Sequence, residues 1–127
     1  MNLDDFDKMV EQRIKLTKDV LMSKSAEYST KEDKLHNFKR AAKVAGCSPE
    51  QALLGMYLKH LVSVLDMIEA VNLLDKEASG KSVTPEEVNK INKTVKFTKE
   101  LIEEKIGDSI NYHILLEALL KERFGDE

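Results

Sequence analysis

Polar side chains capable of chemistry recur at helical spacing in the most apolar stretch of the chain, residues 53–68 and the turn that follows. Lys59, Ser63 and Asp66 follow one another at intervals of four and three residues, and His60 and Glu69 flank them. Residues three or four apart lie on the same side of a helix. This stretch is therefore predicted to carry one polar stripe along an apolar helix.

A second stripe lies near the carboxyl end of the chain. Glu104, Asp108 and Asn111 share a face of the predicted last helix, and Tyr112 sits beside them. An unpaired buried charge is costly. When the two helices pack, we therefore expect the base Lys59 or His60 of the first stripe to meet a carboxylate of the second.

Two interpretations of these stripes remain open. In the first, they form a structural network of ion pairs and hydrogen bonds that fixes helix register. In the second, Mg²⁺ is held by four carboxylates, those of Asp66, Glu69, Glu104 and Asp108. The other polar residues would then serve a bound phosphate compound: Lys59 neutralising phosphate charge, His60 orienting or donating a proton, and Asn111 or Tyr112 bonding the base or sugar.

Apolar spacing predicts an all-α fold, a four- or five-helix bundle, formed as one domain from residues 1–127. The predicted helices cover about residues 4–25, 35–45, 49–74, 85–96 and 98–123, with a loop at 26–34 and a linker at 75–83. Two starts have clear capping signals: Ser48 followed by Pro49 and Gln51, and Thr84 followed by Pro85 and Glu87.

The central predicted helix is apolar nearly all round, which is typical of a helix surrounded by neighbours. Four partners of this length are too few to cover it, so a homodimer is predicted.

Composition narrows the class of protein. With 42% hydrophobic and 34% charged residues among 127, the chain is predicted to be globular. It has no membrane-spanning stretch or readable secretory signal, and its single cysteine, Cys47, cannot form an internal disulfide. These features predict a cytoplasmic protein. The net charge of −3 argues against binding nucleic acid through a general basic surface.

The chain resembles a group of small helical proteins encoded by bacteriophages and prophages, associated with nucleotide modification. The resemblance runs from Tyr28 to Leu120, with residues 71–98 unmatched, and rests on NFKRAA (37–42), LLGMYLKHLVSVLDMI (53–68) and EEKIGDSINYHILLEALL (103–120). The group's pattern of a basic residue and His, then D-x-x-N-Y, falls on five residues: Lys59, His60, Asp108, Asn111 and Tyr112.

The last of these motifs is also similar to part of the all-α nucleoside triphosphate pyrophosphatases, the MazG and dimeric dUTPase superfamily. Those enzymes pair E-x-x-E with E-x-x-D to hold Mg²⁺ and cleave between the α and β phosphates. The corresponding pairs here are Asp66 with Glu69, and Glu104 with Asp108, the latter four residues apart. The resemblance implies a phage-type protein that binds, and as an enzyme hydrolyses, a nucleoside triphosphate with Mg²⁺. The alternative is a non-enzymatic helical interaction module, which predicts a large exposed apolar patch.

Overall fold

The computed structural model describes residues 1–23, 33–94 and 97–125. Over these ranges the chain forms five helices and no strand: α1 (Leu3–Ser23), α3 (His36–Ala45), α4 (Pro49–Ala78), α5 (Pro85–Thr94) and α6 (Lys99–Phe124). The predicted all-α bundle is confirmed. Tyr28, most of the predicted loop at 26–34 and the predicted break near Lys96 lie outside the described residues.

Both helix starts predicted from capping signals are confirmed. The Ser48 hydroxyl accepts a hydrogen bond from the Gln51 backbone N–H over 3.1 Å, and Pro49 is the first residue of α4. Ahead of α5, Thr84 and Glu87 cap each other: the Glu87 N–H donates to Thr84 Oγ1 over 3.2 Å, and the Thr84 N–H donates to Glu87 Oε1 over 3.3 Å. These local bonds satisfy amide groups that the first helical turn leaves without a partner.

Helix α4 runs four residues further than the predicted end at residue 74, to Ala78. Residues 75–78 contain neither glycine nor proline, and the first glycine beyond them, Gly80, takes a positive φ of 75°. The Lys76 ammonium also bonds the Glu87 carboxylate over 3.1 Å, which ties α5 to this last turn. Gly80, which ends the helix, and the contact between Lys76 and Glu87 together determine where α4 ends.

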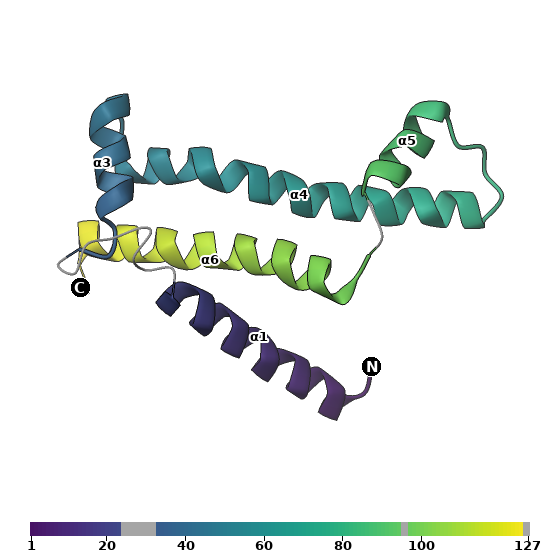
Figure 1. Ribbon diagram of the computed structural model, residues 1–127, viewed down its shortest axis with the longest axis horizontal. Coiled ribbons are helices and arrows are strands. Elements are labelled where there is room, and N and C mark those ends of the chain that lie inside the picture. The colour runs from purple at the N-terminus through teal and green to yellow at the C-terminus, as the bar shows by residue number, and fades with distance from the viewer. Residues whose placement is uncertain (24–32, 95–96, 126–127) are drawn as a thin grey trace.

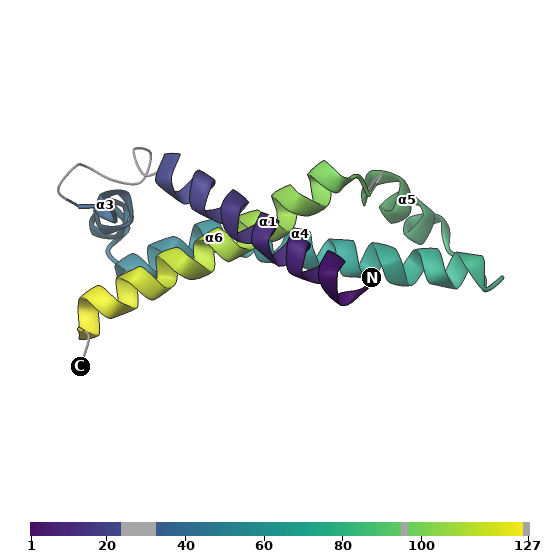
Figure 2. The same ribbon diagram turned by 90° about the horizontal axis from the view of Figure 1, so that it is seen from below.

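The helices form an elongated assembly (Figures 1 and 2). Helices α4 and α6 run antiparallel along each other, α3 crosses them at one end, α5 packs on the opposite end of α4, and α1 lies across α6. The buried core is at the α3 end, where Phe38 is 0% and Leu53 1% exposed and Leu119 of α6 packs with them. At the same end Arg123 bonds Glu50 through two contacts of 2.8 Å, which fastens α6 to α4.

The prediction that α4 is surrounded by neighbours is wrong for the single chain. Eight of its large apolar side chains are exposed: Leu54, Met56, Leu58, Val62, Leu65, Ile68, Val71 and Leu74. Helices α3 and α5 cover only its ends, and α6 covers one side. Across the described ranges, no helix is long and apolar enough to cross a membrane.

Candidate functional site

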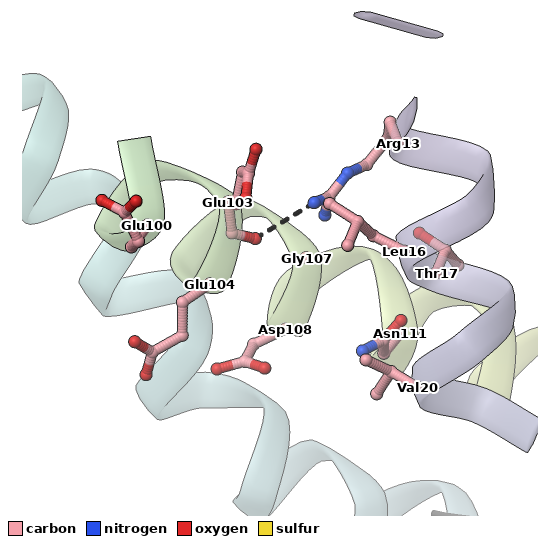
Figure 3. A pocket seen from close by; sticks show the side chains of 10 residues that line it. All are labelled: Arg13, Leu16, Thr17, Val20, Glu100, Glu103, Glu104, Gly107, Asp108 and Asn111. Atoms are coloured by element: carbon pink, nitrogen blue, oxygen red, sulfur yellow. Dashed lines mark hydrogen bonds between the residues drawn. The ribbon is translucent and has the colours of Figure 1, made fainter. Parts of the chain in front are cut away.

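A cavity of about 320 Å³ with both polar and apolar walls lies between α1 and α6 (Figure 3). Helix α1 contributes one wall and the first half of α6 the other. The lining residues are Arg13, Leu16, Thr17 and Val20 from α1, and Glu100, Glu103, Glu104, Gly107, Asp108 and Asn111 from α6. Four acidic residues and one arginine therefore line the cavity, and in Figure 3 the carboxylates of Glu104 and Asp108 point away from Arg13.

Arg13 is the cation of this cavity, and Gly107 makes room for it. The Arg13 Nη2 donates to the Glu103 carbonyl oxygen over 3.3 Å, which links α1 to the backbone of α6. A Cβ built on Gly107 would lie 2.5 Å from Arg13 Nη1. Any larger residue at this position must therefore displace the guanidinium.

Two polar atoms of the cavity residues are buried without a hydrogen-bond partner among the described residues. They are Asn111 Oδ1, in a residue only 8% exposed, and Thr17 Oγ1 on the facing helix. Leaving a buried acceptor or donor unsatisfied costs roughly 1–3 kcal/mol. Such atoms commonly mark a place where a ligand, ion or water completes the bonding.

Asp108 joins this cavity to the seam between α4 and α6. Its carboxylate lines the cavity, and Oδ2 also lies 3.6 Å from Nδ1 of His60 on α4. The His60 ring stacks on Tyr112, with centroids 4.8 Å apart and planes 28° apart. Tyr112 in turn stacks on Tyr57 at 6.0 Å. An imidazole held between a carboxylate and an aromatic face has a fixed orientation.

A second polar contact borders the other side of the same seam. The Tyr57 hydroxyl hydrogen-bonds the His113 ring, where it contacts Nδ1 and lies 2.8 Å from Nε2. The Nδ1 atom also lies 3.0 Å from the Ser109 carbonyl oxygen of its own helix. His60 with Asp108 faces the α1 side of the seam, and Tyr57 with His113 faces the opposite side.

Only part of the predicted site comes together. His60, Asp108, Asn111 and Tyr112 lie close to one another, and Glu104 lines the same cavity with its carboxylate on the same side as that of Asp108. The expectation that a base from α4 meets a carboxylate from α6 is met by the pair His60 and Asp108.

The other polar residues predicted for the site on α4 do not reach the cavity. Lys59, Asp66 and Glu69 are exposed and do not line the cavity, and the Ser63 hydroxyl bonds the carbonyl oxygen of Lys59 in its own helix over 3.0 Å. The predicted meeting of the α4 stripe with the carboxylates of α6 is therefore not made by Lys59, Asp66 or Glu69. The reason is that α6 packs on the face of α4 that carries Leu53, Tyr57 and His60.

The residues that line the cavity offer oxygen donors and neither an imidazole nor a thiol. No three Asp, Glu, His or Cys side chains of the described residues are grouped closely enough to form a metal cage. Mg²⁺ needs no such cage, because it is commonly held by one or two carboxylates while water and substrate phosphates supply the other oxygens. Glu104, Asp108 and the amide oxygen of Asn111 are oxygen donors of this kind.

The cavity residues contributed by α1 were missed by sequence analysis, as were Glu100 and Glu103. One signal for Arg13 was present: it occupies a position within the apolar stripe of α1, between Val10 and Thr17, where a charged residue needs a partner. Comparison of the chain with models of known protein families, with curated proteins and with solved structures gives no match.

Proposed function

We propose that the cavity between α1 and α6 binds a nucleoside triphosphate together with Mg²⁺. The observation that carries this proposal is the unpartnered, buried Oδ1 of Asn111 in a cavity also lined by Asp108 and Glu104. A fully satisfied structural network would leave no buried acceptor open at its centre. The motif resemblance to phage nucleotide-modification proteins supports a nucleotide as the ligand.

Each residue of the site has a defined role under this proposal. Glu104 and Asp108 hold the cation, while Arg13 neutralises phosphate charge in place of Lys59. Asn111 bonds a polar group of the ligand, and His60 fixes the orientation of the Asp108 carboxylate. Hydrolysis would proceed by attack of water on the α-phosphorus with pyrophosphate as the leaving group.

The test is a panel of deoxynucleoside and ribonucleoside triphosphates with and without Mg²⁺, followed by thermal shift and by pyrophosphate release. Asp108→Asn is expected to abolish the Mg²⁺-dependent shift. Glu117→Gln is the matched control, because Glu117 is an exposed carboxylate of the same helix that pairs with Lys121 over 3.3 Å, away from the cavity. Absence of a shift with every nucleotide would refute binding, and a shift without pyrophosphate release would limit the function to binding.

A non-enzymatic interaction module is the second candidate, and one observation favours it. Large apolar side chains are exposed along α4, and also on α1, where Leu3 is 81%, Ile14 61% and Phe6 50% exposed. Monomeric proteins rarely expose contiguous apolar surface on this scale. If no nucleotide binds, this candidate becomes the leading function.

A further inference from the structure

We infer that a second copy of this chain packs on the open face of the α4–α6 pair, forming a homodimer through this face. The inference does not rest on nucleotide binding and would stand if that proposal failed. It concerns the side of the seam bordered by Tyr57 and His113, opposite the cavity with α1.

On the α4 half of this face, apolar residues have the spacing that is typical of two helices packed against each other. Leu54, Leu58, Leu61, Leu65 and Ile68 follow one another at intervals of four, three, four and three residues. This is the repeat that lets side chains of one helix fit between those of another. Leu58, Leu65 and Ile68 are 49%, 62% and 54% exposed, whereas Leu61 packs against the core. In the described part of the chain, no helix packs on this row of exposed α4 side chains.

The α6 half continues the apolar surface. Helices α4 and α6 run antiparallel, and Tyr57 of α4 bonds His113 of α6 (Figure 1). On each helix, the residues on the far side of this contact from α1 therefore lie on one common side of the helix pair. On α6 these include Ile102 and Leu120, 42% and 40% exposed. Leu116 and Leu120 also line a shallow groove of about 440 Å³ beside His113. The two helices therefore present one broad apolar face.

The whole chain exposes more surface than a compact monomer of its mass, by an amount comparable to one dimer interface. The single chain has 9392 Å² of accessible surface, whereas a monomer of 14.4 kDa is expected to have about 6,800 Å². The difference is about 2,600 Å². Obligate homodimers bury about 1,000–2,500 Å² on each partner. One such interface is enough to remove most of the excess.

The chemistry of the face favours a copy of itself over a charged partner. None of the five α4 residues from Leu54 to Ile68 carries a charge. The two charged residues of the α6 groove, Glu117 and Lys121, have opposite signs and pair with each other over 3.3 Å, so two identical faces meet without net like-charge repulsion. Leucine and isoleucine are also the residues that pack well against themselves in helical seams.

The first experiment measures mass in solution by light scattering, using the full chain. The wild type is expected at twice 14.4 kDa, and Leu65→Lys at 14.4 kDa with its helical circular dichroism retained, since Leu65 is 62% exposed in the single chain. Ile14→Lys is the matched control, because Ile14 is equally exposed at 61% but lies on α1. A monomeric wild type overturns the inference, as does a dimer disrupted by Ile14→Lys and not by Leu65→Lys.

A second experiment does not depend on disrupting the dimer. In a Cys47→Ser background, single cysteines replace Leu54, Leu58, Leu65 or Ile68, and each variant is oxidised alone and in pairwise mixtures, which covers both helix orientations. At least one combination is expected to form a disulfide-linked dimer, well above the level given by Ile14→Cys. Cross-linking no higher than that control contradicts the inference.

Discussion

The carboxylate of Asp108 lies 3.6 Å from the His60 imidazole and at the same time lines the cavity between α1 and α6. It therefore belongs both to the seam that holds α4 on α6 and to the candidate ligand site. A residue that only fixed helix register would not need to border a cavity with Glu104 and an unpartnered Asn111 amide. The structural role and the ligand-binding role of Asp108 can be separated by comparing variants of Asp108 with variants of His60.

Asp108→Asn and His60→Gln are predicted to lower stability by similar small amounts, no more than about 1 kcal/mol, because both change the same partly exposed contact between an imidazole and a carboxylate. Their effects on ligand binding should differ. Asp108→Asn removes a cation ligand and should abolish the Mg²⁺-dependent thermal shift, while His60→Gln should only weaken it. Urea denaturation and nucleotide titration of both variants make the comparison. If both variants lose the same stability, and Mg²⁺ has no effect on the wild type, then the contact between His60 and Asp108 serves only to hold α4 against α6.

Asn111→Leu is predicted to stabilise the protein without ligand and to remove ligand binding. The side chain is 8% exposed and its Oδ1 is unsatisfied, so an apolar residue of similar shape relieves a penalty of roughly 1 kcal/mol or more. A rise in the denaturation midpoint with loss of the nucleotide-induced shift is the expected pair of results. Asn89→Leu, at an exposed position of α5, is the control and should change stability by less than about 0.5 kcal/mol. A destabilised Asn111→Leu would mean that the amide is satisfied.

Gly107→Ala separates helix stability from the position of Arg13. Alanine is favoured over glycine inside a helix by about 1 kcal/mol, so α6 gains intrinsic stability. The new Cβ displaces the guanidinium, whose Nη1 would lie 2.5 Å away, and weakens its bond to the Glu103 carbonyl. We expect unchanged or higher stability with affinity for triphosphate reduced about fivefold, the equivalent of about 1 kcal/mol. Affinity unchanged from the wild type would show that Arg13 does not contact the ligand.

The fold was largely predictable because its signals are local. Ser48 with Pro49 and Thr84 with Glu87 begin helices through contacts within one turn, so neighbouring residues suffice to place them. The four-residue extension of α4 was missed although residues 75–78 contain neither glycine nor proline, because the Lys76 contact with Glu87 that holds this last turn is tertiary.

The candidate site was only half predictable. On α6, Glu104, Asp108 and Asn111 share a face that does line a cavity, but the facing wall comes from α1. Helix α4 is apolar nearly all round, so its sequence does not indicate which side meets α6. Gly107 appears in the sequence as a gap in the carboxylate spacing, whereas in the structure it is the space that Arg13 fills. Such a contact between distant segments leaves no periodic signal.

The Glu50 and Arg123 pair predicts how stability depends on pH. Hydrogen bonding to Arg123 holds the pKa of Glu50 below its usual value of 4.5. The folded state therefore binds the proton less readily than the unfolded state, and the pair stabilises the fold fully above the unfolded pKa. This contribution is lost as the pH falls through the lower, folded-state pKa. Glu50→Gln should thus be less stable than the wild type at pH 7, and the two should converge as the pH falls below the usual pKa of 4.5 and through the lower, folded-state pKa. Denaturant melts at pH 7, 5 and 3 measure this, with Glu77→Gln, an exposed carboxylate at the other end of α4, as the control. A stability gap that persisted unchanged to pH 3 would show that the packing of Glu50, and not its charge, supports the fold.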